Sequence, residues 1–415
     1  MEGRLDQPSA RAPVVGFVVP RYGADVAGGA EAVVRELAEG LAARGHAIEV
    51  LTSCARDHTT WRNEYPAGVS VVEGVTVRRF PAVVSRTRTT RVLFNRAIAA
   101  GSPLRLDEQD RWLNDDARVP RLFEYLVDHG RRYRALVLAP YLYWTTVAAA
   151  QAWTERSVLM PCLHDEPEAG LEVFRPLFTT VRGIWFLSEP EARLAARLHP
   201  DLADHRVIGS GVRPPTAYDA ARFRKRYGIE GRFVLYAGRR EAGKGWDELL
   251  AGFGAACERA ALPFSLVTMG AVPVHTSGAL AERVVDLGFV PPEDRDDACA
   301  AADAVLQPSR YESFSRTIME AWLAGTFVIA NGASAVNRWH CERAGAGLLY
   351  DDDLELEQCL RFVADAPDAA AALGAAGRVY ALETANWSAV LDRTEAALDT
   401  WFPPALPSST SDEES

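Results

Sequence analysis

The sequence lacks the ligand spacings that hold zinc, and it has no apolar run long enough to span a membrane. Its six cysteines are scattered, without a Cys-x-x-Cys or a Cys/His pair at zinc spacing, so we expect buried thiols in a reducing compartment. Residues 1–12 are polar and the apolar run 14–19 is short, so we expect no signal peptide. These absences favour a cytoplasmic protein. The cysteines are Cys54, Cys162, Cys257, Cys299, Cys341 and Cys359.

A basic excess is also absent. The chain has 45 Lys and Arg against 56 Asp and Glu, a formal net charge of −11. This balance argues against a nucleic acid as the main partner, because nothing offsets a phosphate backbone. The fingerprint Gly-x-Gly-x-x-Gly does not follow the first apolar run, so a dinucleotide cofactor is not supported.

The length and the order of patterns indicate two α/β domains. A chain of 415 residues exceeds the usual size of one core. Apolar runs of strand length alternate with helical patterns over residues 14–208 and again over 233–350, which is typical of parallel sheets. Glycines and prolines at 209–215 separate the two halves and predict an interdomain hinge.

These patterns predict domain boundaries and individual strands. We expect an N-terminal domain at 13–210, a C-terminal domain at 211–385, a final helix at 386–402 and disorder at 1–12 and 403–415. The predicted strands of the first domain are 14–19, 47–52, 75–80, 135–139, 157–163, 183–187 and 206–208, and those of the second are 233–237, 264–269, 284–290, 304–307, 326–330 and 347–350.

Residues 310–325 are the most informative segment. Glu312 lies in a polar loop, and Glu320 lies on a predicted helix, 317–324, with Ser313 or Ser315 as N-cap. Predicted strands on both sides place this loop at the carboxyl edge of a parallel sheet, where ligands bind. A helix N-terminus suits a phosphate, and carboxylates accept hydrogen bonds from sugar hydroxyls. The combination predicts a nucleotide-sugar site.

This segment resembles the glutamate-pair signature of the retaining glycosyltransferases of family 4. That family has the GT-B fold, in which two Rossmann-like domains face each other across a deep cleft. Residues 238–245, Gly-Arg-Arg-Glu-Ala-Gly-Lys-Gly, are similar to the family's Gly-Arg…Lys-Gly loop. The resemblance implies that Arg239 and Lys244 grip the diphosphate and stabilise it as it leaves.

The resemblance implies further roles in donor binding. Glu312 would hold the hexose hydroxyls and Glu320 the ribose, and His164, at the end of a strand, would bond the donor sugar. Ser315 stands where the family usually has glycine. The remaining donor-binding candidates are the loop glycines Gly28 and Gly29, the helix-start amides of Ser315, Arg316 and Thr317, and the backbone near Phe289 and Val290 for the base.

The expected activity is metal-independent transfer of a hexose, with retention, from a nucleotide sugar to a glycan, a lipid-linked or a small-molecule acceptor. No cofactor is expected. The acidic runs 294–297 and 351–353 are interpreted as solvated loops distant from the site, not as metal ligands. The alternatives are a phosphorylase or a nucleotide-sugar epimerase of the same fold, and a non-catalytic sugar-nucleotide-binding protein.

A basic and apolar segment at 83–96 is a candidate for acceptor or membrane contact. It holds four arginines, Arg86, Arg88, Arg91 and Arg96, near Val92, Leu93 and Phe94. Such a patch suits an anionic acceptor or the inner face of a membrane, although a solvated loop is the favoured interpretation. Asp165 and Glu166 are weaker candidates for acceptor contact.

Overall fold

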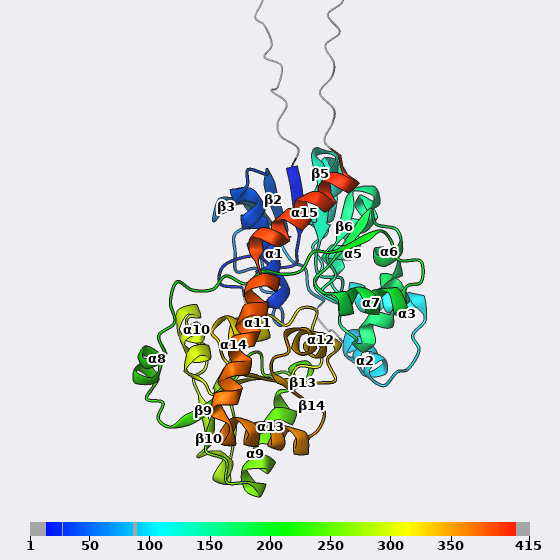
Figure 1. The fold of residues 1–415 in the computed structure, drawn as a ribbon. Helices are drawn as coiled ribbons and strands as arrows, with labels where there is room; N and C mark the ends of the chain where they lie inside the picture. The colour runs from blue at the N-terminus through cyan, green and yellow to red at the C-terminus, as the bar shows by residue number, and fades with distance from the viewer. Residues whose placement is uncertain (1–13, 27, 86–88, 404–415) are drawn as a thin grey trace, which may run out of the picture.

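The computed structural model describes residues 14–26, 28–85 and 89–403. These residues form two α/β halves, each built around its own sheet, with the first half above the second in Figure 1. The segments predicted to be disordered, 1–12 and 403–415, lie outside the described residues apart from Pro403.

The first half contains an eight-stranded sheet in the order β3-β4-β2-β1-β5-β6-β7-β8. All neighbours are parallel except β3, which pairs antiparallel with β4 at the edge. The sequence patterns did not predict β3, because its valines Val69 and Val71 point to solvent at that edge. The strands are β1 Val14–Val18, β2 Ile48–Ser53, β3 Gly68–Val72, β4 Val75–Phe80, β5 Tyr133–Leu138, β6 Ser157–Leu159, β7 Gly183–Phe186 and β8 His205–Val207.

The second half contains a six-stranded parallel sheet in the order β11-β10-β9-β12-β13-β14. The chain winds outward from β9 in one direction and then from β12 in the other, so the strand order reverses between these neighbours. Such a reversal leaves a crevice at the carboxyl ends of the two strands. The strands are β9 Arg232–Ala237, β10 Phe264–Met269, β11 Val284–Asp286, β12 Ala304–Gln307, β13 Val328–Asn331 and β14 Leu348–Tyr350.

Two predicted strands are shorter than expected for local reasons. The strand predicted at 157–163 ends at Leu159, shortly before Pro161, which has no N–H for a ladder. The strand predicted at 284–290 ends at Asp286, because Gly288 turns the chain with φ of +63°.

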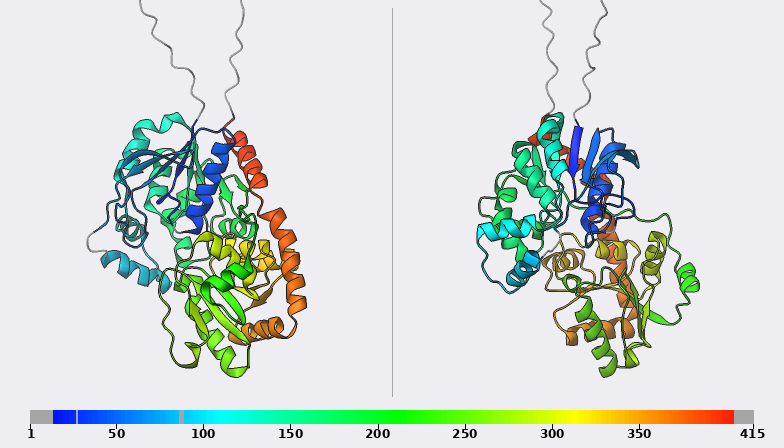
Figure 2. Two further views of the ribbon diagram at one scale, coloured as in Figure 1. Left: turned by 90° about the vertical axis from the view of Figure 1, so that its left-hand side faces the viewer. Right: turned by 180° about the vertical axis from the view of Figure 1, so that it is seen from behind.

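Helices cover the faces of both sheets, as the views from the side and from behind show (Figure 2). In α1, Val33, Leu37 and Leu41 recur on one face and are buried. The helices are α1 Gly29–Ala43, α2 Thr89–Ala99, α3 Leu106–Asn114, α4 Pro120–His129, α5 Trp144–Ala152, α6 Arg175–Thr179, α7 Glu189–Leu198, α8 Ala220–Tyr227, α9 Trp246–Arg259, α10 Pro292–Ala301, α11 Arg316–Leu323, α12 Ala335–Ala344, α13 Asp353–Asp365, α14 Pro367–Thr384 and α15 Trp387–Trp401.

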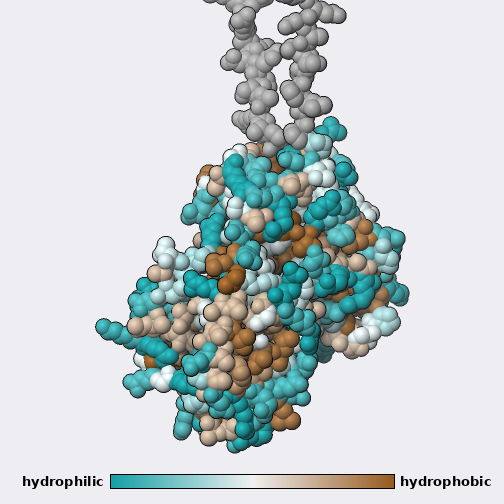
Figure 3. Space-filling view, in the orientation of Figure 1, coloured by the Kyte–Doolittle hydropathy of each residue, from teal (hydrophilic) through white to brown (hydrophobic). Residues whose placement is uncertain are grey.

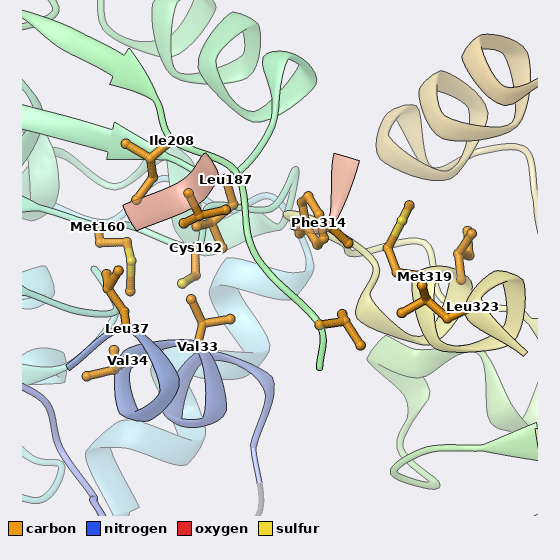
Figure 4. Close-up of a cluster of buried hydrophobic side chains, with 14 of the residues drawn as sticks. Val33, Val34, Leu37, Met160, Cys162, Leu187, Ile208, Phe314, Met319 and Leu323 are labelled. Atoms are coloured by element: carbon orange, nitrogen blue, oxygen red, sulfur yellow. The ribbon is translucent and has the colours of Figure 1, made fainter. Parts of the chain in front are cut away.

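One cluster of buried apolar side chains continues from the first half into the second. Figure 4 shows Val33 and Leu37 of α1 near Cys162, and Phe314 near Met319 and Leu323 of α11. Because apolar burial is the main stabilising term in folding, this shared cluster holds the two halves against each other.

The last helix, α15, lies against the first half although α14 before it packs on the second (Figure 1). Trp401 donates to Asp204 at 2.7 Å, and Arg44, which follows α1, contacts Asp392 and Glu395 at 2.7 and 2.6 Å. The chain thus crosses from the second half back to the first at its C-terminal end.

The acidic run 294–297 corrects the sequence interpretation. It belongs to helix α10 and not to a loop, and Asp294 and Asp297 are buried. Arg226 and Tyr227 bond Asp294, and Arg222 bonds Asp297, because buried carboxylates require partners. The second run, 351–353, is exposed as expected.

Polar side chains cover most of the face in Figure 3, and apolar residues gather over the lower half. Val379 and Leu382 of α14 are among the exposed apolar residues of that half. Among the residues with described structure, no helix is long and apolar enough to cross a membrane.

Candidate functional site

The candidate residues of the second half follow the two strands between which the order reverses. Arg239 and Lys244 follow β9, and Glu312 follows β12. Because β9 and β12 are adjacent and parallel, both loops leave the sheet at the same edge. His164 of the first half follows β6 and stacks at 6.5 Å on Tyr311, so the carboxyl edges of the two sheets face each other.

Lys244 and Glu312 form an ion pair at the centre of this site. Lys244 Nζ lies 2.8 Å from a carboxylate oxygen of Glu312, and both side chains are largely buried. Burial acts to raise the pKa of Glu312, but Lys244, Ser309 and His164 outweigh it, so the pKa lies below its ordinary value. The glutamate is therefore ionised at neutral pH and offers its other oxygen as an acceptor.

The loop after β9 also presents Arg239 to solvent. Its guanidinium is about half exposed and lies 3.1 Å from Glu241, while its carbonyl accepts a hydrogen bond from Tyr236 at 2.6 Å. Gly245 ends this loop with φ of +67°, and a Cβ there would lie 2.4 Å from the carbonyl oxygen of Pro308. Only glycine lets the two loops approach this closely.

Buried side chains fix the loop that carries Glu312. His340 bonds the carbonyl of Phe314 and the hydroxyl of Tyr380, both at 2.9 Å. Ser315 precedes α11 with φ of +59°, a left-handed conformation that explains why glycine is usual there. Ser315 is the N-cap residue of α11, as the sequence predicted, but its hydroxyl accepts from Gln307 and makes no cap hydrogen bond to the helix.

Acidification is expected to destabilise the protein through His340. Burial lowers the pKa of this histidine to about 3, whereas an unfolded chain titrates near about 6.5. Between these values only the unfolded chain binds the proton, so the free energy of unfolding falls with falling pH, by at most about 1.4 kcal/mol per unit. The free energy of unfolding, measured with urea between about pH 7 and 5, should fall less steeply with pH in His340→Gln than in the unaltered protein. Equal dependence on pH in the two proteins would contradict this role.

Glu320 is held by arginines from two helices. Arg295 of α10 forms a close ion pair with it, and Arg316, one turn earlier on α11, lies 4.0 Å away. The acidic run 294–297 is therefore next to the site and not distant from it. Burial, and after it the charge of Glu320, raises the pKa of the neighbouring Asp296 to about 6.

Arg316 connects the site to the first half of the chain. Its guanidinium donates to Glu36 of α1 at 2.9 Å and to the carbonyl of Gly211 at 2.7 Å. Trp387 of α15 donates to the same glutamate at 2.9 Å. The side chain of Arg316 thus bridges the two halves. The sequence had suggested only a donor-binding role for its backbone amide, and the same role for the amide of Thr317.

The side chain of Glu166 supports His164. A carboxylate oxygen of Glu166 lies 3.6 Å from His164 Nδ1, and the other accepts from Tyr141 at 2.7 Å. Burial acts to raise the pKa of Glu166, but His164, Tyr141 and Lys244 lower it below its ordinary value. Its neighbour Asp165 points outward and pairs with Arg197. Glu166 therefore faces the site, whereas Asp165 does not.

The glycine loop after β1 carries an acidic residue that the sequence interpretation left out. Glu31, in the first turn of α1, forms a close ion pair with Arg21. A Cβ on Gly28 would collide with the Glu31 carboxylate, whereas Gly29 has open space around it. The structure therefore gives a packing reason for Gly28 alone.

The proposed base-binding residues lie in the loop that follows β11. Phe289 is 79% exposed although it is a large apolar residue, and Val290 next to it is buried. An exposed aromatic side chain held at a loop tip is available for contact with a ligand.

One sequence signal for the site was overlooked. The 415 residues include only two lysines, Lys225 and Lys244, so nearly every basic position is arginine. A lysine is a compact, flexible point charge, and arginine is a rigid fork. Lysine at 244 in a chain so rich in arginine indicates a position that requires a compact, flexible charge and not the rigid fork of arginine.

Comparison with known families identifies part of the chain. Residues 231–365 match the family described as Glycosyl transferases group 1. This segment runs from β9 to α13 and includes Arg239, Lys244, Glu312 and Glu320. It is therefore a glycosyl transferases group 1 domain.

Two curated relatives match over limited stretches. Mannosylfructose-phosphate synthase of Agrobacterium fabrum is 34% identical over 137 residues, covering 27% of this chain and 30% of that protein. The 2-deoxystreptamine glucosyltransferase of Streptomyces kanamyceticus is 29% identical over 178 residues, covering 39% and 45%. The chain thus spans less than half the length of each.

Solved structures match over nearly the whole chain. Sucrose-phosphate synthase from Thermosynechococcus elongatus gives a TM-score of 0.71 at 19% identity, covering 94% of this chain and 99% of that one. HepE of Anabaena, in complex with UDP and glucose, gives 0.68 at 16%, covering 94% and 100%. The architecture is the GT-B fold, as the sequence predicted.

Proposed function

We propose that this protein transfers a hexose from a nucleotide-diphosphate sugar to an acceptor hydroxyl, with retention of anomeric configuration. The observation that carries the proposal is the ion pair of Lys244 and Glu312, which joins the loops after β9 and β12 opposite His164 of the first half, with Arg239 exposed on the first of these loops. The acceptor would be a glycan, a lipid-linked sugar or a small molecule.

In the proposed reaction, the bond from the anomeric carbon to the phosphate oxygen breaks on the face where the acceptor oxygen bonds. The proton of the acceptor hydroxyl passes to the departing phosphate. Arg239 and Lys244 stabilise the charge that develops on this leaving group, and helix-start amides of α11 add to it. Glu312 and His164 hold the hexose, and Glu320 holds the ribose.

The test measures first the binding of nucleotides and nucleotide sugars, and then turnover of the donor that binds best. Thermal melts with UDP, GDP, ADP and dTDP and their sugars should show stabilisation by one of them, because a ligand of the native state stabilises it by mass action. UDP is tried first because HepE holds it. The best donor should then release its nucleoside diphosphate on incubation. Phosphate-dependent cleavage would indicate a phosphorylase, epimerised donor an epimerase, and binding without turnover a non-catalytic protein.

Metal removal is expected to leave the activity unchanged. The proposed site stabilises the diphosphate with Arg239 and Lys244, and no group of three metal-ligating side chains lies within the described part of the chain. Turnover should be equal in excess EDTA and in Mg²⁺ or Mn²⁺. Loss of turnover in EDTA, restored by either metal, would contradict metal independence.

Peripheral membrane contact remains part of the proposal, but with fewer residues of the segment 83–96 than the sequence suggested. Arg86 and Arg88 lie outside the described residues, and Arg91 is used internally, 3.0 Å from Asp116 and stacked on Trp112. Val92, Leu93 and Arg96 are exposed on α2. Replacing both Val92 and Leu93 with serine should reduce co-sedimentation with anionic vesicles. Unchanged sedimentation, or none in the parent protein, would exclude this surface.

A further inference from the structure

Two consecutive arginines follow β9, and their side chains have different surroundings. Arg239 is exposed at the proposed diphosphate site, whereas the side chain of Arg240 is 1% exposed. Arg240 donates to Thr268 at 3.1 Å and to the carbonyl of Gly270 at 3.2 Å, and it makes close contacts with the carbonyl of Val272 and with Asp286. Arg240 thus connects the loops that follow β9 and β10 to the end of β11.

Asp286 completes this connection. Its two carboxylate oxygens accept hydrogen bonds from the backbone amides of Gly288 at 2.9 Å and Val274 at 3.0 Å. Burial acts to raise the pKa of Asp286, but these amides and Arg240 lower it below its ordinary value. A backbone bond from the amide of Gly270 to the carbonyl of Gly288, at 2.9 Å, joins the same two loops.

The connection determines where Phe289 and Val290 lie relative to Arg239. Phe289 follows the turn that Asp286 holds, and its exposure needs a rigid support, since a free loop would fold an aromatic ring onto the surface. Arg239 is covalently next to Arg240. The ion pair between the buried Arg240 and the partly exposed Asp286 therefore fixes the distance between the proposed diphosphate site and the proposed base site.

We propose that Arg240 and Asp286 are positioning residues for nucleobase recognition, which hold the segment 288–290 at a set place relative to the diphosphate. This inference rests on the proposed function. It implies that the pair influences which base is preferred, although neither side chain need touch the nucleotide. The other view is that the pair only stabilises the fold.

The chain offers a matched control on the same strand. Arg232, at the opposite end of β9, pairs with Asp303 at 2.7 Å and donates to the carbonyls of Val363 and Ala364. It thus makes the same kinds of bond as Arg240, away from the carboxyl edge of the sheet. Arg232→Met should also lower stability, and to a smaller extent, because the side chain of Arg232 is 31% exposed and that of Arg240 is 1% exposed.

The experiment compares nucleotide selectivity in Arg240→Met, Asp286→Asn, Arg240→Lys and Arg232→Met. Calorimetry with UDP, GDP, ADP and dTDP varies the base and keeps the diphosphate. In Arg240→Met and Asp286→Asn, affinity for the preferred nucleotide should fall by about tenfold or more, and the others should change by less than about threefold. The KM for the donor should rise while kcat stays within about threefold. Arg240→Lys should recover part of the selectivity, and Arg232→Met should keep all of it.

Two results would overturn the inference. Equal proportional losses of affinity for every nucleotide would show a general loss of the site, and unchanged affinity for all of them would show that the pair does not position the base. If Arg240→Met does not fold by circular dichroism, Asp286→Asn decides, because it preserves size while it removes the charge and one of the two acceptor oxygens. Failure of the unaltered protein to bind any of the four nucleotides would refute the proposed function, whereas retained selectivity in the variants refutes this inference alone.

Discussion

Turnover is expected to fall by about 100-fold when Lys244 or Arg239 is replaced with alanine, with the fold intact. Losing one fixed donor to a developing negative charge typically costs about 3 kcal/mol of transition-state stabilisation. Lys244 is half of a largely buried ion pair, so its removal also leaves Glu312 without its closest partner. Arg239 is exposed and paired only loosely with Glu241, so its loss reports on the leaving group alone.

Lys225 provides the control for Lys244, because the chain has only these two lysines. Lys225 is exposed on α8, and Lys225→Ala should leave turnover unchanged.

After reductive methylation with ¹³C, two lysine methyl signals are expected in the NMR spectrum, and only that of Lys244 should move when the nucleotide that the protein binds is added. Measuring kcat for Lys244→Ala/Glu312→Gln separates loss of the cation from exposure of the carboxylate. Near-native kcat in both single variants would remove these residues from the proposed diphosphate site.

The two glutamates are expected to fail in different ways. Glu320 is proposed to hold the ribose, which does not react, so Glu320→Gln should weaken binding of both the nucleoside diphosphate and the donor. Glu312 is proposed to hold the transferred hexose. Glu312→Gln should spare nucleoside diphosphate binding, or strengthen it by releasing Lys244 from its ion pair, and yet lower kcat, because misplacement at the reacting centre is costly in rate.

Calorimetry with the nucleoside diphosphate decides between these roles. Arg295→Gln is the companion to Glu320→Gln, because it removes the arginine that holds that carboxylate, and it should weaken binding in the same direction. Lost nucleotide affinity in Glu312→Gln, with affinity kept in Glu320→Gln, would reverse the two assignments. If neither variant changes affinity or rate, the glutamates have no part in the site.

Local sequence patterns were sufficient for most of the elements. The predicted strands 75–80, 264–269 and 304–307 coincide with the structure, and the final helix predicted at 386–402 is found at Trp387–Trp401, because each is an apolar run or period bounded by turn residues. The acidic run 294–297 was misread for the same local reason. Consecutive charges resemble a solvated loop until arginines and a tyrosine from α8 bury and pair them.

The sequence by itself determined the two α/β halves and the short motifs, in which residues a few positions apart share one loop or one helix face. It thereby specified Arg239 with Lys244, and Glu312 with Glu320. Only the tertiary structure decided which of these side chains meet. Lys244 pairs with Glu312 across 68 positions and Arg316 with Glu36 across 280. Such contacts depend on strand order and on the packing of the two halves, and no local pattern encodes either.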